Sequence, residues 1–310
     1  MIATVTMNPA VDYTVLLEEP LVRNSVNRTS HERITAGGKG VNVSLVLQQL
    51  QIPTTVYGYL SGTTGTMIAE QLQRTQIPTD WIVLPNQMNR INLKVKDHDA
   101  VTELNGRGVA VSPADAKLLL EKLRKYGNGD YIVLAGSVPA GAPATFYADI
   151  MHALADTGVR FAVDAEGEAL RAALAEHPFV VKPNLRELCS VFGIDEIVTW
   201  WDALPYGRQM IEMGAQHVLL SLGADGALLF NEENRVWHLS APHGEVKNAV
   251  GSGDSMLGGF LAGCATGREI TEALRMGIAA GSATAFSEWI ATRSRMDNLL
   301  KALPCPTELL

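Results

Sequence analysis

The sequence predicts an α/β fold in which helices cover both faces of a mostly parallel central sheet. Short apolar segments alternate with longer amphipathic segments along most of the 310 residues. The short segments are apolar almost throughout, which is typical of strands that are buried on both faces. Hydrophobic residues make up 47% of the chain, so a large core can form. Together these observations predict a three-layer α/β/α sandwich.

The expected strands and helices follow one another as in repeated β-α units. The strands are Val56–Leu60, Tyr131–Ala135, Arg160–Asp164, Phe179–Lys182 and Val218–Ser221. The helices are Gly40–Leu50, Pro113–Tyr126, Pro143–Asp156 and Leu204–Met213, followed by a helix-rich region from Asp254 to about Leu303. Pro113 and Pro143 suit the first turn of a helix, where a backbone N–H has no partner within the helix.

Two regions interrupt this alternation. Residues 11–35 contain polar and extended stretches, and residues 90–106 contain two short strands, Ile91–Val95 and Val101–Leu104. We expect these regions to form a small antiparallel sheet inserted into a single domain that spans residues 1–310. Such a sheet is a candidate lid over an active site and a candidate contact in a homodimer.

Charge and cysteine content exclude several classes of protein. The formal net charge is −8, which argues against a protein that coats nucleic acid. Cys189, Cys264 and Cys305 are far apart and odd in number, which disfavours a disulfide framework or a zinc site. The N-terminus lacks a signal-peptide pattern, and no run approaches the roughly 18 apolar residues of a membrane span. We therefore expect a protein of the reducing cytoplasm, without a membrane or nucleic-acid partner.

The segment Val250-Gly251-Ser252-Gly253-Asp254 is the strongest candidate for a catalytic site. Two glycines separated by one residue permit a tight turn with exposed N–H groups, and the turn opens a helix whose dipole attracts anions. A carboxylate beside such a site can serve as a catalytic base, and the alternative is a simple N-cap. The helix dipole predicts a lowered pKa for Asp254. The segment matches neither a Walker A loop nor a dinucleotide fingerprint, which disfavours a nicotinamide oxidoreductase.

A second glycine-rich segment, Gly37-Gly38-Lys39-Gly40-Val41-Asn42, also precedes an apolar helix. Lys39 can meet a phosphate as a point charge and Asn42 can bind hydroxyl groups, whereas the alternative is a turn with a solvated lysine. Arg90 and Lys94 lie four residues apart on an expected strand, so both side chains point to the same face. Two cations on one face favour an anionic ligand, and a solvated strand face is the alternative.

The order of these motifs resembles the ribokinase-like phosphofructokinase-B family of sugar kinases from end to end. The segments that carry the resemblance are Thr6–Asp12, Gly37–Asn42, Gly136–Pro139, Lys182–Glu187, Ser221–Gly226 and Val250–Asp254. The resemblance implies a ribokinase-like fold, ATP and Mg²⁺ as cofactors, and Asp254 as the base beside an anion hole built by Gly251, Ser252 and Gly253.

The same resemblance implies which residues hold each ligand. Those expected at the sugar phosphate are Asp12, Gly37, Gly38, Lys39, Asn42, Arg90, Asn92, Lys94, Asn105 and Ser137, with Lys39, Arg90 and Lys94 facing its phosphate. Those expected at the nucleotide are Lys182, Asn184, Ser221, Gly223, Gly226, Val250, Gly251 and Gly253. Asn184 and Glu187 are expected to organise Mg²⁺ through water.

Within this family, the segments Arg90–Lys94, Thr102–Gly106 and Gly281–Ser287 resemble the branch that phosphorylates the 6-hydroxyl of fructose 1-phosphate. Two alternatives stay open: a tagatose-6-phosphate kinase and a non-catalytic sugar-phosphate sensor. Glu166 and Val109 depart from the family pattern, which usually has a small hydroxyl residue and a proline there. We expect His243 to be an incidental loop residue, and Trp200 and Trp201 to pack at the surface.

Overall fold

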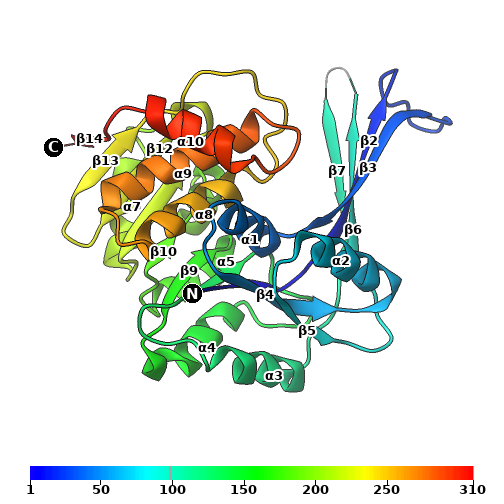
Figure 1. Ribbon diagram of the computed structural model, residues 1–310, viewed down its shortest axis with the longest axis horizontal. Coiled ribbons are helices and arrows are strands. Elements are labelled where there is room, and N and C mark those ends of the chain that lie inside the picture. Colours follow the sequence, from blue (N-terminus) through cyan, green and yellow to red (C-terminus); the bar gives the residue numbers. More distant parts are fainter. Residues whose placement is uncertain (98–99, 310) are drawn as a thin grey trace.

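The computed structural model describes residues 1–97 and 100–309 of the chain. Over these residues, a large sheet carries helices on both faces, and a smaller sheet projects from this body (Figure 1). In the described part of the chain, no helix is both long and apolar enough to cross a membrane.

The large sheet is parallel over most of its width. Its strands are β1 (Ile2–Thr6), β4 (Thr54–Leu60), β5 (Thr79–Val83), β8 (Tyr131–Ala135), β9 (Arg160–Asp164), β10 (Val180–Val181), β11 (His217–Ser221), β12 (Ala227–Asn231), β13 (Val236–Leu239) and β14 (Thr307–Leu309). Their order is β14-β13-β12-β11-β10-β9-β8-β1-β4-β5. Pairs from β11 to β5 are parallel, and pairs from β11 to β14 are antiparallel. The strand order therefore reverses between β1 and β8.

Helices cover the two faces of this sheet and create two main cores. One face carries α3 (Pro113–Leu123), α4 (Phe146–Ala153), α5 (Gly167–Leu174), α6 (Leu185–Phe192) and α7 (Leu204–Glu212). The other carries α1 (Lys39–Gln49), α2 (Gly62–Thr75), α8 (Ser252–Ala265), α9 (Ile270–Ala285) and α10 (Arg293–Ala302). Side chains of β8 alternate between the cores: Ile132 and Leu134 enter the first, and Val133 enters the second.

Glycines let α8 and α9 pack closely. A Cβ atom at Gly259 would lie 2.4 Å from the carbonyl oxygen of Met276, and one at Gly277 would lie 2.9 Å from the carbonyl oxygen of Met256. Real side chains essentially never make such contacts with backbone. The close packing therefore fixes the position of α8, which begins at the candidate catalytic turn.

The smaller sheet, which we call the lid sheet, has the strand order β3-β2-β6-β7. Its strands are β2 (Ala10–Leu17), β3 (Thr29–Gly37), β6 (Arg90–Lys96) and β7 (Val101–Asn105). The outer pairs are antiparallel, as expected, whereas the central pair of β2 and β6 is parallel because both strands leave the body in the same direction (Figure 1).

The expected elements are present, and their boundaries differ in two informative places. The strand expected at Phe179–Lys182 shortens to Val180–Val181, which leaves Lys182 just beyond the sheet edge. The helix expected from Pro143 begins at Phe146, so the expectation that Pro143 occupies the first helical turn is wrong. The N–H of Phe146 donates to the carbonyl of Pro143, and this separate turn precedes the helix.

Candidate active site

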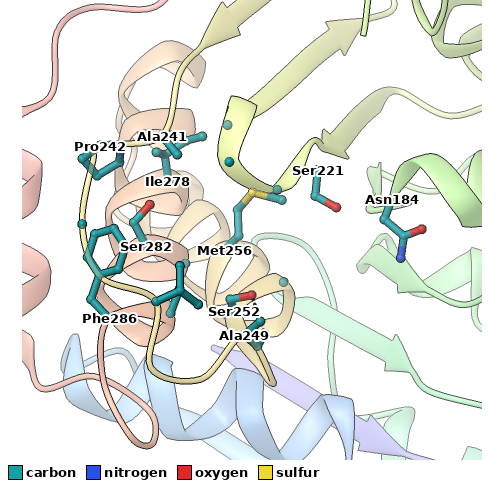
Figure 2. A pocket seen from close by; sticks show the side chains of 18 of the residues that line it. Asn184, Ser221, Ala241, Pro242, Ala249, Ser252, Met256, Ile278, Ser282 and Phe286 are labelled. Carbon is teal, nitrogen blue, oxygen red and sulfur yellow. Dashed lines mark hydrogen bonds between the residues drawn. The ribbon is translucent and has the colours of Figure 1, made fainter. Parts of the chain in front are cut away.

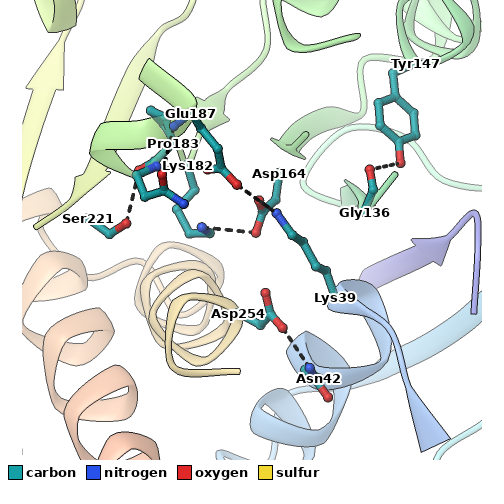
Figure 3. A network of polar contacts seen from close by, with 11 residues as sticks. Lys39, Asn42, Gly136, Tyr147, Asp164, Lys182, Pro183, Glu187, Ser221 and Asp254 are labelled. Atoms are coloured by element: carbon teal, nitrogen blue, oxygen red, sulfur yellow. Dashed lines mark hydrogen bonds and ion pairs between the residues drawn. The ribbon is translucent and has the colours of Figure 1, made fainter. Parts of the chain in front are cut away.

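Open parallel sheets usually bind ligands at the carboxyl edge of their strands, near the point where the strand order reverses, which is here between β1 and β8. Asp164 ends β9 and Lys182 follows β10, so both residues lie at the carboxyl edge of the sheet. The N-termini of α1 and α8 approach the same place (Figure 3). Two helix N-termini beside one strand edge form a strongly anion-binding position.

The turn before α8 has the conformation that its glycines predict. Gly251 has φ of 80°, in the left-handed region, and serves as the N-cap residue of α8. Ser252 donates its hydroxyl to the carbonyl of Ala249 over 2.7 Å, and Asn248 Oδ1 accepts the N–H of Val250 over 3.2 Å. The N–H of Ser252 also donates to the carbonyl of Ala249, over 3.2 Å. These bonds fix the turn, and the N–H groups of Gly253 and Asp254 have no partner inside the helix.

Asp254 lies in the first turn of α8 and is buried. Its Oδ2 accepts a hydrogen bond from Asn42 Nδ2 over 2.7 Å, which joins the two glycine-rich motifs (Figure 3). Burial and the nearby Asp164 carboxylate raise the pKa of Asp254 to about 6, against the opposing charges of Lys39 and Lys182. The expected lowering by the helix dipole is therefore wrong, because desolvation of the carboxylate dominates.

Asp164 is the centre of a buried group of charges beside Asp254. Its Oδ1 lies 2.8 Å from Lys39 Nζ and its Oδ2 lies 3.2 Å from Lys182 Nζ. Lys39 Nζ also lies 3.2 Å from Glu187 Oε1. Burial opposes the charge on Asp164, but the two ammonium groups outweigh it and lower the pKa of this carboxyl. Burial disfavours the charged form of Lys39, but the carboxylates of Asp164, Glu187 and Asp254 outweigh it and raise the pKa of this ammonium group.

These contacts place Lys39 beside Asp164 and Glu187, where its charge also acts on Asp254, whereas the sequence assigned it to the phosphate of the sugar together with Arg90 and Lys94. Asp164 did not enter the sequence-based site at all. Its position as the last residue of a buried parallel strand was the available signal, since the carboxyl ends of such strands gather ligand-binding side chains.

Asn184 and Glu187 form a reciprocal cap at the start of α6. Asn184 Oδ1 accepts the N–H of Glu187 over 2.8 Å, and Glu187 Oε2 accepts the N–H of Asn184 over 2.9 Å. Glu187 Oε1 meets Lys39, so each carboxylate oxygen already has a protein partner. Within residues 1–97 and 100–309, no cluster of three or more His, Cys, Asp or Glu side chains has the geometry of a metal site.

The inner face of the lid sheet carries a second buried polar group. Asp12 and Lys94 are both buried, and Lys94 Nζ lies 3.5 Å from Asp12 Oδ2. Asn92 Nδ2 donates to Asp12 Oδ1 over 2.9 Å. Arg90 Nε donates to the carbonyl of Asn8 over 3.1 Å, and burial lowers the pKa of its guanidinium. Arg90, Asn92 and Lys94 alternate along β6, so they share one face as predicted.

The glycines of the first motif make room for this group. A Cβ atom at Gly37 would lie 2.5 Å from the carboxylate carbon of Asp12, so only glycine lets β3 pass beside that side chain. Gly38, with φ of 131°, lies between the end of β3 at Gly37 and the start of α1 at Lys39. The motif therefore turns the chain from the lid sheet into the body.

The remaining sequence-predicted residues lie around this inner face. Asn105 pairs with Asn92 across β6 and β7, and Ser137 Oγ accepts a hydrogen bond from Asn8 Nδ2 over 3.5 Å. Glu166 is exposed and borders the hollow beside Ser137, and Val109 is fully buried in the core. The valine that replaces the usual proline therefore contributes apolar packing.

A cavity of about 540 Å³ lies on the other side of the candidate catalytic turn (Figure 2). It is lined by six of the residues that the sequence assigned to the nucleotide, namely Lys182, Asn184, Ser221, Gly223, Gly226 and Gly253. Val250 and Gly251 do not line it, and Val250 instead borders the hollow beneath the lid sheet. Figure 2 shows apolar side chains of Pro242, Ile278 and Phe286 on one side and the polar Asn184 and Ser221 on the other. Such a division suits a ligand with an apolar ring at one end and charged groups at the other.

Sequence reasoning missed several lining residues of this cavity. His243, which we expected to be an incidental loop residue, is exposed and lies at the border of this cavity. Pro242, Ile278 and Phe286 gave no signal because apolar residues on loops and helices are usually read as core. Trp200 and Trp201 stack on each other, with ring centroids 3.9 Å apart, and Trp200 stacks on His238, so they pack as expected.

The charges around Asp254 predict opposite effects of two substitutions on its pKa. Asp164→Asn removes a carboxylate that raises the pKa, so the Asp254 pKa should fall below about 6. Lys182→Met removes a cation that lowers it, so the pKa should rise above about 6. A pH titration of ¹³C-labelled aspartate carboxyls by NMR measures both values. Asp149→Asn, at an exposed site on α4, is the control. Shifts of the same sign in both variants would contradict this electrostatic account.

Comparison with known proteins identifies the family. The model of the pfkB family carbohydrate kinases matches residues 5–291. The chain is 41% identical over 300 residues to 1-phosphofructokinase of Bacillus subtilis, covering 97% of each chain. It is 34% identical over 297 residues to D-tagatose-1-phosphate kinase of Bacillus licheniformis, covering 96% of each.

Solved structures agree with the sequence relatives. Phosphofructokinase-2 from Escherichia coli in complex with substrates and products matches with a TM-score of 0.90 and 27% identity, covering 97% of this chain and 99% of that chain. Arabidopsis thaliana ribokinase has the same fold, with a TM-score of 0.78 and 22% identity, covering 97% and 98%. The expected resemblance is confirmed: the chain belongs to the pfkB family of carbohydrate kinases and has the ribokinase-like fold.

Proposed function

We propose that the chain transfers the γ-phosphoryl group of ATP to the 6-hydroxyl of fructose 1-phosphate and so forms fructose 1,6-bisphosphate. One observation carries this proposal. The segment from Asn248 to Gly253 separates two hollows: Ala249, Ser252 and Gly253 line the large cavity, whereas Asn248 and Val250 line the hollow beneath the lid sheet. A donor in the first hollow and an acceptor in the second would meet at the turn that carries Asp254.

The proposed reaction uses this arrangement in a single step. Oxygen 6 of the sugar attacks the γ-phosphorus, the bond to the β-phosphate oxygen breaks, and Asp254 takes the hydroxyl proton as ADP leaves. With a pKa of about 6, most Asp254 side chains are ionised at neutral pH. The first amides of α8 stabilise charge on the moving phosphoryl group. In a loose transition state the proton leaves late, so position of the base matters more than its strength.

The large cavity suits ATP, with its base beside Phe286 and Pro242 and its phosphates toward Lys182. A Cβ atom at Gly253 would lie 3.3 Å from Lys182 Nζ, so this ammonium group reaches the catalytic turn. Mg²⁺, when bound, neutralises the phosphates of ATP. Asn184 and Glu187 would hold it through water, because both carboxylate oxygens of Glu187 already have protein partners.

The lid side suits a sugar that already carries a phosphate. Arg90 and Lys94 supply cations on the inner face of the lid sheet. Within the described residues, the buried Oδ1 atoms of Asn42 and Asn92 accept no hydrogen bond. An unpaired buried acceptor costs about 1–3 kcal/mol, so hydroxyl donors of a sugar would satisfy both sites. Asp12, Gly38, Asn105 and Ser137 complete the proposed sugar site.

A second candidate substrate is D-tagatose 1-phosphate, because relatives of that name match almost the whole chain. Tagatose differs from fructose only in the configuration at carbon 4, so the reaction and the phosphate site are shared. The names of these relatives specify a sugar 1-phosphate, which favours tagatose 1-phosphate over tagatose 6-phosphate as the alternative substrate. The greater identity to 1-phosphofructokinase supports fructose 1-phosphate as the first choice.

We propose that the body and the lid sheet act together as one kinase domain. We also propose that this kinase works in the reducing cytoplasm. The three free cysteines support this compartment, and Cys305 is exposed. Alkylation of the protein in intact cells, followed by mass spectrometry, should find all three cysteines reduced. A disulfide would contradict the assignment.

Replacement of the proposed base should abolish most turnover without preventing binding. Asp254→Asn keeps the size of the side chain and removes its negative charge. We expect kcat to fall by about 10²–10⁴, the usual contribution of general base catalysis, with nearly unchanged KM values. Steady-state kinetics with fructose 1-phosphate measures both constants. Retention of kcat within a few fold of the wild type would exclude Asp254 as the base and leave a non-catalytic role open.

The identity of the acceptor is tested with a substrate panel. Initial rates are measured with fructose 1-phosphate, tagatose 1-phosphate, tagatose 6-phosphate and fructose 6-phosphate at fixed MgATP. The proposal expects the greatest kcat/KM for fructose 1-phosphate, followed by its carbon-4 epimer. A greater kcat/KM for either 6-phosphate would contradict the proposal and point to the opposite orientation of the sugar.

The outer face of the lid sheet supports a homodimer. Strand register places Leu104, Leu93, Tyr13 and Ile34 in one row across the sheet, on the face opposite Asp12. Leu104 is 59% exposed and Ile34 is 45% exposed. Contiguous exposed apolar side chains usually mark an interaction surface. A second copy of the chain would cover this row.

Charged substitutions in this row should dissociate the dimer. Leu104→Lys and Ile34→Lys place a cation in the proposed interface, whereas Leu118→Lys changes a leucine on α3 that is 46% exposed, close to the exposure of Ile34. Sedimentation equilibrium should give a dimer for the wild type and Leu118→Lys, and a monomer for the two lid variants. A monomeric wild type, or lid variants that stay dimeric, would contradict this interface.

A further inference from the structure

One arginine of the lid sheet reaches across to the body of the protein. Arg33 lies on β3 and is half-buried. Its Nη1 donates to the carbonyl oxygen of Glu288 over 3.0 Å, and its Cζ lies 4.8 Å from the ring centroid of Trp289. A planar guanidinium can make both contacts at once, through its edge and its face. Arg33 therefore attaches the lid sheet to the segment that follows α9.

The same carbonyl oxygen also anchors the catalytic turn. Asn248 Nδ2 donates to Glu288 O over 3.1 Å, and Asn248 Oδ1 accepts the N–H of Val250 over 3.2 Å. The N–H groups of Lys247 and Asn248 both donate to the carbonyl of Ala285, over 2.8 and 3.1 Å. The turn that leads to Gly251 is thus held by residues 285–288, the segment that Arg33 contacts.

These contacts border the proposed sugar site. The hollow beneath the lid sheet is lined on the lid side by Asp12, Arg33 and Lys94, and on the body side by Val250 and Trp289. The hollow has a volume of about 60 Å³, so it would hold one end of a sugar phosphate, which would touch both sides. Its binding and the Arg33 contacts therefore favour the same closed arrangement of lid and body.

We propose that Arg33 is a positioning residue that couples closure of the lid sheet to the order of the Asn248–Gly253 turn. With the lid closed, Glu288 O accepts two donors and Asn248 aligns the backbone of Val250. With the lid open, one donor is lost and the turn is less constrained. The amides that stabilise the phosphoryl group are then well positioned only when an acceptor sugar is enclosed, which limits transfer of phosphoryl to water.

This inference rests on the proposed function, and its test includes a measurement that needs no substrate. Hydrogen exchange of a peptide that covers residues 247–253 is followed in the wild type, Arg33→Ala and Arg33→Lys. Arg28→Ala changes an exposed arginine before β3 and is the control. We expect exchange to be faster by about tenfold in Arg33→Ala, the effect of one charged hydrogen bond. Arg33→Lys keeps the charge but loses the planar group, so it should recover only part of the protection.

Steady-state kinetics distinguishes a role of Arg33 in positioning the Asn248–Gly253 turn from a role only in attaching the lid sheet to the body. Arg33→Ala should lower kcat about tenfold, raise the ratio of ATP hydrolysis to sugar phosphorylation, and leave KM for ATP unchanged. Trp289→Leu should have the same effects, and the double variant should be no worse than the more impaired single variant. Unchanged exchange at residues 247–253, or a change confined to KM for the sugar, would overturn the proposal.

The two proposals fail in different ways. If the substrate panel finds no sugar phosphate that the wild type phosphorylates, the proposed function is wrong. Faster exchange of residues 247–253 in Arg33→Ala would still establish the coupling in that case. Turnover of fructose 1-phosphate with unchanged exchange would leave the function intact and eliminate only the role of Arg33.

Discussion

The site depends on one buried carboxylate, Asp164, held between Lys39 and Lys182. Each of these residues comes from a different element: the end of β9, the N-terminus of α1, and the residue after β10. Loss of one partner from a buried ion pair costs about 3–5 kcal/mol, because the other charge stays desolvated. This requirement constrains the relative positions of three elements around Asp254. It also sets the charge environment in which that carboxyl titrates.

Glycine and small residues make this convergence sterically possible. The helix that carries Asp254 packs against α9 where a methyl group would collide with backbone, and β3 passes Asp12 where only Gly37 fits. The hydrogen bond from Asn42 to Asp254 then joins the two glycine-rich motifs, which are more than 200 residues apart in the chain. Packing and polar contacts thus bring the end of β3, α1 and α8 to the same point.

The two faces of the lid sheet differ in chemical character because strand residues alternate between faces. Asp12, Asn92 and Lys94 point toward the body, and the row that includes Leu104 and Ile34 points away. The inner face suits a polar sugar phosphate and the outer face suits another apolar surface. A shift of one residue in register would exchange these roles, so register is under constraint on both faces.

The sequence by itself determined the layered α/β architecture, the lid strands, the anion-binding turn and the family, because these follow from local periodicity, glycine spacing and the order of motifs. Only the tertiary structure decided which charged side chains form ion pairs and how their pKa values shift. It paired Lys39 with Asp164 and Glu187, raised the pKa of Asp254, and brought His243 and Phe286 into the large cavity. Burial and long-range ion pairs arise only when the chain is packed, so the local sequence around these residues could not predict them.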